Sequence, residues 1–381
     1  MAQGLAEKGH EITVLYADRF GHSTSIPKDP NIKFIPVRFR LPKIFQTPVV
    51  GRIINYLGLT ELIRFQEDSK LISRSINFLQ LEKPFDVIES PSNGATLYRY
   101  LTSINSSNCM IRIATTDKKH SSINSTTTSS YLKRTLEEES KTLNQCPNLV
   151  THTYAHRDNI CREYNLPTQK FSIIPLSVKI PLAEEILPTF NKRKTVVLFV
   201  GRFEKRKGID LMFEIIPRVL LVNEDVEFRL VGEDLNKDHQ IAFQSKHPQI
   251  QDKVCFMGKI STKELENEYR NCNVFIAPSR YESFGLIYAE AMSYAKPVIG
   301  TNVGGIPEVI GKDNSGILCE NENVDSFVQA LIKLTQDSEM SSRMGRSARK
   351  RAIQLFDRKT LISRTENYYS RTIKAHKTES D

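Results

Sequence analysis

Short apolar runs alternate with amphipathic stretches along most of the chain, and this alternation predicts a parallel α/β architecture. In the first half, apolar runs typical of strands lie at 11–16, 32–37, 85–90, 110–114, 148–152 and 171–175. Amphipathic patterns typical of helices lie between several of these runs, at 60–80, 130–145 and 155–164. The low-complexity stretch SSINSTTTSS, at 121–130, is expected to form a mobile loop.

The second half of the chain restarts the same pattern. Its first run, TVVLFV at 195–200, has no polar residue after Thr195, as expected for a central parallel strand that is covered on both faces. Further strands are expected at 226–232, 254–258, 273–278, 296–300 and 316–319. Helices are expected near 208–222, 262–271, 285–294 and 323–336.

A stretch without sustained periodicity separates the two halves. PLSVKIPLAEEILPTFNKRK, at 175–194, contains three prolines and then charged residues, as interdomain linkers do. We therefore expect two Rossmann-like domains that face each other across a cleft, the first at 1–180 and the second at 195–355, joined by a linker at 181–194. Residues 356–381 are expected to form a basic amphipathic helix with a disordered tail.

The composition is that of a globular enzyme, with 39% hydrophobic and 25% charged residues. Its 53 Lys and Arg against 44 Asp and Glu give a net charge of +9. This excess suits an anionic ligand or an acidic membrane surface, although it can also serve solubility alone. No pattern of a nucleic-acid-binding module is present, so nucleic acid is not an expected partner.

Two further classes of protein are disfavoured by the sequence. No run approaches the roughly 18 apolar residues of a membrane-spanning helix, and the N-terminus lacks the features of a signal peptide, so we expect a cytoplasmic protein. The six cysteines form no C-x-x-C pair and no histidine stands at metal-ligand spacing, so we expect reduced thiols and no metal site.

Basic residues follow the strand at 195–200 directly. GRFEKRKGID places Arg202 and Lys207 beyond the carboxyl end of that strand, where open α/β sheets bind ligands. A guanidinium, an ammonium and the start of the next helix together suit a diphosphate without a metal ion. The alternative is a solvated basic loop, because Lys205 and Arg206 lie there too. Neither a Walker P-loop nor a G-x-G-x-x-G pattern is present.

Two glutamates bracket an apolar run in RYESFGLIYAEAM, at 280–292. A helix is expected to start near Phe284, at the carboxyl edge of the second sheet, with Glu282 just before it and Glu290 within it. Eight residues of helix span roughly 12 Å, which is comparable with the distance from the ribose to the sugar of a nucleotide-sugar. Carboxylates accept hydrogen bonds from vicinal hydroxyls, so each glutamate can bind one end of such a ligand.

The backbone N–H groups at the start of this helix, those of Phe284, Gly285 and Leu286, can meet phosphate or sugar oxygens. Two other roles remain open for the glutamates: Glu282 can complement the helix dipole, and Glu290 can lie on a solvated helix face. Later in the chain, TNVGGIPEVI brings Gly304–Gly305 to another strand-to-helix turn that is expected on the same edge.

Four segments in this order and spacing, GRFEKRKG, FMGKISTKELENEYRNCNVFIAPSRYESFGLIYAEAM, PVIGTNVGGIPEVI and SGILCENEN, resemble the C-terminal domain of glycosyltransferase family 4. The resemblance implies the GT-B fold and retaining, metal-independent transfer of a sugar from a nucleotide-diphospho-sugar, without a cofactor.

The resemblance also implies roles for individual residues. Arg202 and Lys207 would hold the donor diphosphate, Glu282 the transferred sugar and Glu290 the ribose, which makes Glu282, Arg202 and Lys207 the candidate catalytic residues. The backbone from Gly258 to Ile260 would lie against the base.

The N-terminal half matches that family more loosely, through LAEKGHEITVLY, FDVIESPSNGATLYRYL and YAHRDNICREYNLPTQKFSIIPLSV. VIESPSNG is similar to members that act on polysaccharide or envelope glycans, which implies a glycan or lipid-linked acceptor. MAQGLAEKG is already helical in character, so the family's first strand and Gly-rich loop would precede Met1. The alternative function is therefore a non-catalytic nucleotide-sugar or glycan-binding protein.

The basic helix at the C-terminus carries four large side chains, those of Phe356, Leu361, Tyr368 and Tyr369. The resemblance implies that this helix crosses back to the first domain. Association with an anionic membrane surface is the alternative, and it applies also to VRFRLPKIF at 37–45, where arginines alternate with large apolar residues.

Overall fold

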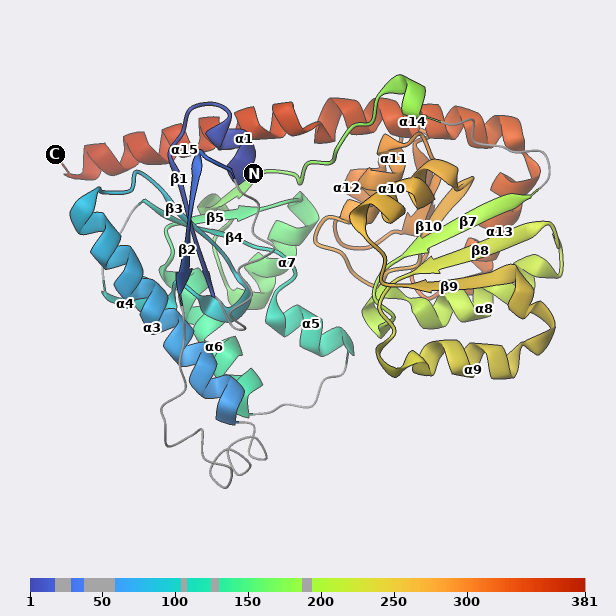
Figure 1. Cartoon of the computed structure of the whole chain (residues 1–381), viewed down its shortest axis with the longest axis horizontal. Helices are drawn as coiled ribbons and strands as arrows, with labels where there is room; N and C mark the ends of the chain where they lie inside the picture. The colour runs from blue at the N-terminus through green and yellow to red at the C-terminus, as the bar shows by residue number, and fades with distance from the viewer. Residues whose placement is uncertain (18–28, 38–58, 104–107, 125–129, 187–193, 381) are drawn as a thin grey trace. The chain divides into compact units, whose positions relative to one another are not determined.

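The computed structural model describes residues 1–17, 29–37, 59–103, 108–124, 130–186 and 194–380 (Figure 1). The chain divides into two compact units. Unit 1 comprises Met1–Thr151, Arg157–Ile174 and Ile362–Asp381, and unit 2 comprises His152–His156 and Pro175–Leu361. The expected linker at 181–194 falls in unit 2, and its residues 187–193 lie outside the described residues.

Unit 2 is built on a six-stranded parallel sheet. Its strands are β7 (Thr195–Val200), β8 (Val226–Val231), β9 (Val254–Gly258), β10 (Val274–Ala277), β11 (Val298–Thr301) and β12 (Gly316–Cys319). They lie in the order β12-β11-β10-β7-β8-β9. Three side chains of β7 and all four of β10 are completely buried, which explains why both strands are unbroken apolar runs in the sequence.

The helices of unit 2 lie between and after these strands: α8 (Ile209–Leu220), α9 (Asp238–Lys246), α10 (Thr262–Asn271), α11 (Leu286–Ser293), α12 (Ile306–Ile310), α13 (Val324–Gln336) and α14 (Ser338–Phe356). Helix α8 shows why they form: Met212, Ile215, Ile216 and Val219 recur at helical spacing and are all fully buried. Helix α10 begins with a capping box, in which Ser261 and Glu264 each bond the other's backbone N–H.

The strand order has a consequence for the loops. The chain passes from β7 through α8 to β8 on one side, and from β10 through α11 to β11 on the other. Strands β7 and β10 are neighbours, so the loops that follow them lead away from each other at the carboxyl edge of the sheet. Open α/β sheets bind ligands at such a switch point.

Unit 1 contains a four-stranded parallel sheet, β3 (Ile88–Pro91), β4 (Cys109–Arg112), β5 (Asn148–Thr151) and β6 (Phe171–Ile173), in chain order, and a parallel pair, β1 (Ile12–Ala17) and β2 (Ile32–Val37). Its helices are α1 (Ala2–Ala6), α3 (Leu59–Glu82), α4 (Tyr98–Ser103), α5 (Asp117–Asn124), α6 (Ser130–Gln145), most of α7 (Tyr154–Tyr164) and most of α15 (Arg358–Ser380). Its core gathers side chains from the sheet and from α3, α4, α6 and α7.

Every strand and helix predicted from periodicity has a counterpart in the structure, and the α/β prediction is confirmed. One local prediction is wrong. Residues 121–124 belong to the last turn of α5 rather than to a loop, because the Ser121 and Ser122 hydroxyls bond carbonyls of the preceding turn instead of interrupting the helix. Residues 125–129 of the same stretch lie outside the described residues.

The C-terminal part of the chain, α14 and α15, makes contacts through several of its large side chains. Phe356, at the end of α14, and Leu361 are almost completely buried, and Tyr369 donates a hydrogen bond of 2.7 Å to Glu89 in unit 1. Glu366 binds both Lys8 and His10 near the start of the chain. No helix among the described residues is long and apolar enough to cross a bilayer.

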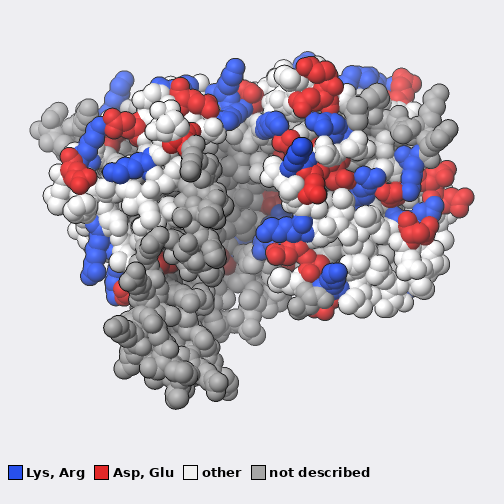
Figure 2. Space-filling view, in the orientation of Figure 1, with Lys and Arg blue, Asp and Glu red and all other residues white. Residues whose placement is uncertain are grey.

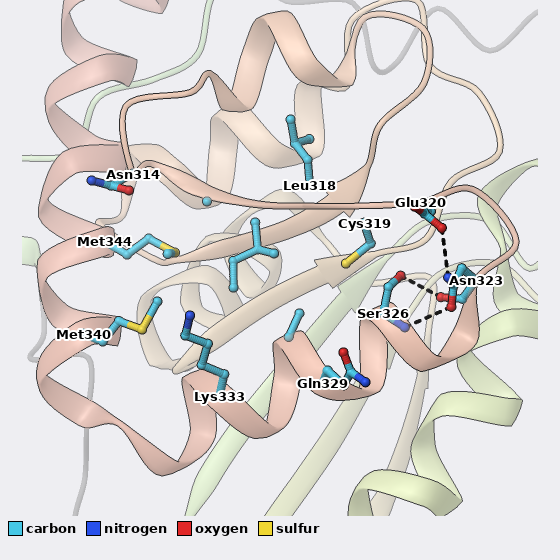
Figure 3. A pocket seen from close by; sticks show the side chains of 13 residues that line it. Asn314, Leu318, Cys319, Glu320, Asn323, Ser326, Gln329, Lys333, Met340 and Met344 are labelled. Carbon is cyan, nitrogen blue, oxygen red and sulfur yellow. Dashed lines mark hydrogen bonds between the residues drawn. The ribbon is translucent and has the colours of Figure 1, made fainter.

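A groove of about 620 Å³ runs along the edge strand β12, between that strand and helices α13 and α14 (Figure 3). Its lining mixes apolar side chains with polar ones, among them Leu318, Met340, Met344, Gln329 and Lys333. The groove contains none of the residues that the sequence assigns to a donor.

Lys296 lies between α11 and β11 with 1% of its surface exposed, and its Nζ has no hydrogen-bond partner among the residues that the structure describes. Burial, opposed by the Cys272 thiol, lowers the pKa of the Lys296 ammonium. An amine that is buried without a partner is held there at a free-energy cost.

Replacing Lys296 by Met should raise the free energy of unfolding near neutral pH by about 1–3 kcal/mol, because the thioether chain fills the space without a polar group. The gain should shrink towards about pH 10, the ordinary lysine pKa, because the unfolded chain then no longer binds a proton that the folded chain lacks. Urea unfolding at the two pH values measures both effects. Lys350→Met, at an exposed position of α14, is the control. A loss of stability in Lys296→Met alone would contradict the prediction.

Candidate functional site

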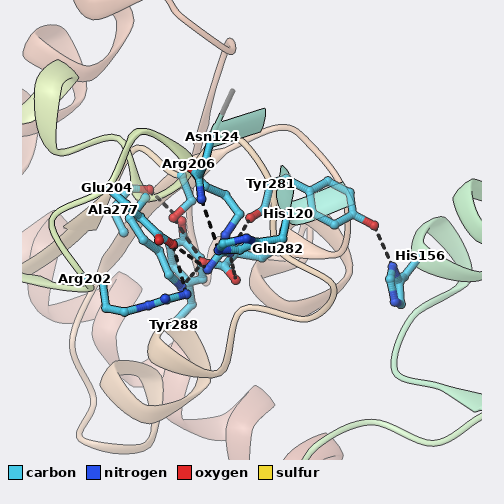
Figure 4. A network of polar contacts seen from close by, with 12 residues as sticks. His120, Asn124, His156, Arg202, Glu204, Arg206, Ala277, Tyr281, Glu282 and Tyr288 are labelled. Atoms are coloured by element: carbon cyan, nitrogen blue, oxygen red, sulfur yellow. Dashed lines mark hydrogen bonds and ion pairs between the residues drawn. The ribbon is translucent and has the colours of Figure 1, made fainter. Parts of the chain in front are cut away.

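Glu282 lies in the loop that follows β10, and its side chain is buried among cations (Figure 4). One carboxylate oxygen, Oε1, accepts hydrogen bonds from Lys207 Nζ at 2.5 Å and from Ser279 Oγ at 3.2 Å. The other oxygen, Oε2, accepts a bond of 3.3 Å from Nη1 of Arg206. Lys207 and Arg206 both come from the loop that follows β7, so the two loops at the switch point are joined through this carboxylate.

The charge state of Glu282 follows from these contacts. Burial alone would favour the protonated acid, but the Lys207 ammonium and the Arg206 guanidinium outweigh it and hold the pKa of the carboxyl below its usual range. Glu282 is therefore a buried carboxylate whose charged form is favoured, at the carboxyl edge of a parallel sheet.

A second carboxylate extends the network outward. Glu204 accepts a hydrogen bond of 2.9 Å from Nη2 of Arg206 and forms an ion pair with Arg202 at 3.2 Å. The two arginines differ in exposure: the Arg202 side chain is 55% exposed and the Arg206 side chain 6%. Arg206 does not belong to a solvated basic loop, so that alternative is wrong for this residue. Its guanidinium is buried and bonds two carboxylates and the Tyr281 carbonyl.

The loop after β7 reaches Glu282 because it can lie directly on the end of β10. Residues Lys205–Lys207 form a single 3-10 turn, which ends at Gly208 with φ of 73°. A Cβ at Gly208 would lie 2.1 Å from the carbonyl oxygen of Pro278, so only glycine fits there. The Arg280 N–H donates a hydrogen bond of 2.8 Å to the Arg206 carbonyl and so connects the two loops.

The Gly304–Gly305 turn between β11 and α12 fixes the backbone of Glu282 from the other side. The Gly305 N–H donates to the Glu282 carbonyl at 2.8 Å, and Gly304 has φ of 55°. A Cβ at Gly304 would lie 2.5 Å from the same carbonyl oxygen. The expectation that this turn lies on the same edge of the sheet is confirmed.

A segment far away in the sequence also holds the Glu282 loop. Thr153 Oγ1 donates a hydrogen bond of 2.8 Å to the Ser283 carbonyl, and His156 Nδ1 lies 2.6 Å from the Tyr281 hydroxyl. Glu308, on α12, accepts bonds from the N–H groups of residues 154 and 155 at 2.9 and 2.7 Å. Sequence reasoning missed this segment, and its one local signal is the threonine that caps the start of α7 by accepting from the residue 156 N–H.

Glu290 has a different environment from Glu282. It is half-buried on α11, and its Oε2 accepts a bond of 2.8 Å from the Tyr269 hydroxyl. Burial raises its pKa, and the bond from Tyr269 opposes this shift. A solvated helix face, which the sequence left open for Glu290, does not describe this position.

The segment between Glu282 and Glu290 is not the continuous helix that the sequence-based prediction assumed. Helix α11 begins at Leu286, because Gly285 has φ of 95° and breaks the helical path before it. The spacer is therefore helical only from Leu286 onward, and the estimate of roughly 12 Å, which assumes eight residues of helix, does not apply to this loop.

The remaining predicted donor residues lie around the same edge. Gly258 ends β9 with φ of 63°, and its carbonyl accepts from the Gly232 N–H at 3.0 Å. Ile260 packs against the core of unit 2. Phe284 is 2% exposed and its ring meets Phe356 edge-on, so only its backbone can serve a ligand.

Parts of the chain are similar to known proteins. Residues 185–351 match the family described as Glycosyl transferases group 1. D-inositol 3-phosphate glycosyltransferase from Streptomyces avermitilis is 24% identical over 245 residues, which are 60% of this chain and 53% of that protein. The chain spans about half the length of the curated relatives it matches.

Two solved structures show the same fold. Sucrose-phosphate synthase from Thermosynechococcus elongatus superposes with a TM-score of 0.75 at 18% identity, over 98% of this chain and 92% of that one. HepE from Anabaena, in complex with UDP and glucose, superposes with a TM-score of 0.62 at 14% identity, over 89% of this chain and 86% of that one. The predicted GT-B fold is thereby confirmed.

Proposed function

We propose that this protein is a retaining glycosyltransferase, which transfers a sugar from a nucleotide-diphospho-sugar to a glycan or lipid-linked acceptor. The observation that carries the proposal is the ionised, buried Glu282 between Lys207 and Arg206, at the point where the loops after β7 and β10 diverge. The matched family covers this whole site. The complex of HepE with UDP and glucose supports a nucleotide-sugar as the ligand.

In this proposal the donor diphosphate lies against Arg202 and Lys207, near the start of α8. A guanidinium and an ammonium there neutralise the charge that the diphosphate gains as it leaves, which is electrostatic stabilisation of the transition state. Glu282 accepts hydrogen bonds from hydroxyls of the transferred sugar and so orients it. Binding of the ribose by Glu290 remains part of the proposal, as does contact of the base with the backbone from Gly258 to Ile260.

The proposed chemistry needs no protein nucleophile. The bond between the sugar's anomeric carbon and the diphosphate oxygen breaks, and the acceptor oxygen bonds to the same face of that carbon. Because the new bond forms on the face from which the diphosphate leaves, the configuration is retained. The acceptor's proton passes to the departing phosphate. Backbone N–H groups at Phe284, Gly285 and Leu286 are available to the phosphate and sugar oxygens at the start of α11.

Removal of the charge at Glu282 or at Lys207 tests the catalytic assignment. Glu282→Gln and Lys207→Ala should each lower the turnover of the nucleotide-sugar by roughly 100-fold or more, as removal of one stabilising group in other enzymes does. Lys205→Ala, an exposed lysine two residues away, and Glu233→Gln should leave turnover unchanged.

The measurement starts with calorimetry of the full chain against UDP-, GDP- and ADP-sugars, and continues with release of the free nucleotide from the sugar that binds. Binding without turnover would favour a non-catalytic nucleotide-sugar-binding protein. Absence of binding across the panel would overturn both functions. Proton NMR of the first sugar product gives its anomeric configuration, and an inverted product would contradict the retaining mechanism.

Metal independence is a second consequence of the proposal, because Arg202 and Lys207 supply the positive charge that a metal ion supplies elsewhere. Treatment with EDTA, followed by assay with and without added Mg²⁺ or Mn²⁺, should leave the turnover rate within about twofold, which is close to no change in barrier height. A rate that collapses with EDTA and returns with one metal ion would contradict this part.

We also propose peripheral association with an anionic membrane surface at the cytoplasmic face. In the view of Figure 2, acidic and basic side chains are intermixed over unit 2 rather than separated. Attraction must then come from the net charge of +9 and from the stretch at 37–45, whose residues 38–45 lie outside the described residues. The exposed basic residues Lys359, Arg364 and Arg371 on α15 add to it.

Sedimentation with vesicles tests this association. The chain should sediment with vesicles of phosphatidylglycerol and phosphatidylcholine, and not with phosphatidylcholine alone. About 1 M salt, which shortens the screening length to roughly 3 Å, should release it. Equal sedimentation with both kinds of vesicle, or with neither, would contradict an electrostatic membrane contact.

A further inference from the structure

We propose that Arg206 is a positioning residue: it holds Glu282 in place as a charged carboxylate, so that Lys207 can turn from Glu282 to the donor diphosphate. This inference rests on the proposed function and assigns a role to a residue that neither the sequence motif nor the resemblance singles out. Glu204 is the second part of the device, because it orients the Arg206 guanidinium from the opposite side.

The Arg206 guanidinium is buried and bonds three groups of unit 2. Nη1 donates to the Tyr281 carbonyl at 3.1 Å and to Glu282 at 3.3 Å, while Nη2 donates to Glu204 at 2.9 Å. Its carbonyl is bonded in turn by the Arg280 N–H at 2.8 Å. With 6% of its side chain exposed, the guanidinium is committed to these groups and does not face solvent, where a diphosphate would arrive.

Lys207 is placed differently. Its ammonium has three donors, and one of them bonds Glu282 at 2.5 Å. A donor diphosphate brings oxygens that compete with the Glu282 carboxylate for this ammonium. A carboxylate that loses its only counter-charge inside a protein is strongly destabilised. Because Arg206 stays behind, Glu282 keeps a positive partner when Lys207 turns to the phosphate.

The order of the charges supports different roles for Arg206 and Arg202. Along the network the charges alternate, from Arg202 to Glu204, Arg206, Glu282 and finally Lys207. Three cations and two carboxylates leave one net positive charge for an anionic ligand. The Glu204 carboxylate lies between the two guanidiniums and offsets their repulsion, so the inner arginine stays on Glu282 while the outer one remains exposed.

The neighbours of Glu282 define how its charge should respond to a change at Arg206. The groups around its carboxylate are the Lys207 ammonium, the Arg206 guanidinium and the Ser279 hydroxyl, and the charge of Glu282 also acts on the Tyr288 hydroxyl of α11. Tyr288 donates its proton to the Ala277 carbonyl at 2.6 Å, so it is no counter-charge. Removal of Arg206 therefore leaves Lys207 as the one cation in direct contact with Glu282 among the described residues.

Binding of UDP and of UDP-glucose to the full chain distinguishes a positioning role of Arg206 from direct binding of phosphate. If GDP- or ADP-sugars bind instead, they and their nucleotides replace UDP-glucose and UDP. Arg206→Met should bind UDP within about threefold of the unchanged chain, under 1 kcal/mol. Lys207→Ala should weaken the binding of UDP by roughly tenfold or more, about 1.4 kcal/mol. Arg206→Met should also lose the added affinity that the glucose unit confers, and its turnover of UDP-glucose should fall by roughly 100-fold.

Two further readouts exclude a merely structural effect. In a Glu282→Gln background, Arg206→Met should change turnover by less than about threefold, because Arg206 acts through that carboxylate. The acidic limb of the turnover profile should move to higher pH in Arg206→Met. In Arg206→Lys, which keeps the positive charge, this shift should be smaller. If Arg206→Met does not fold, Arg206→Gln carries the same measurements, since it removes the charge and keeps a hydrogen-bonding side chain.

Three results would overturn the inference. An equal loss of UDP affinity in Arg206→Met and Lys207→Ala would make Arg206 a phosphate ligand. Full additivity with Glu282→Gln would show that it does not act through Glu282, and unchanged turnover would show that it has no role. If the unchanged chain binds no nucleoside diphosphate or nucleotide-sugar, the proposed function itself fails, which is a separate outcome.

Discussion

The carboxylate of Glu282 is buried, and the cost of removing it from water governs the surrounding structure. A buried carboxylate costs several kcal/mol unless cations and hydrogen bonds replace its hydration. Here Lys207, Arg206 and Ser279 replace it. The two cations precede Glu282 by 75 and 76 positions in the chain, so the pairing is possible only because β7 and β10 are neighbours in the sheet. The loop chemistry and the strand order therefore depend on each other.

Close backbone approach is the second requirement of the same arrangement. The turn at Gly208 lies on the carbonyl of Pro278, and the turn at Gly304 lies on the carbonyl of Glu282, each at a distance that leaves no space for a Cβ. Both glycines also have positive φ. The Glu282 loop is thus enclosed by backbone on two sides, which reduces its freedom to move before a ligand binds.

The two glutamates of the 280–292 segment, Glu282 and Glu290, have opposite electrostatic environments. The cations around Glu282 lower its pKa despite burial, whereas burial raises the pKa of Glu290, which has a neutral phenol as its partner. The cations favour the charged form of Glu282, and burial without a counter-charge disfavours the charged form of Glu290.

The order of residues was sufficient to predict most element types, because apolar periodicity reports which face of each strand or helix is buried. It also placed Arg202, Lys207 and Glu282 on one edge, because carboxyl ends of parallel strands share an edge. Tertiary structure alone decided that Arg206 is buried, that residues 152–156 hold the Glu282 loop, and that α11 begins at Leu286. Those outcomes depend on which strands are neighbours and on contacts between distant segments, and a local pattern of residues carries no information about either.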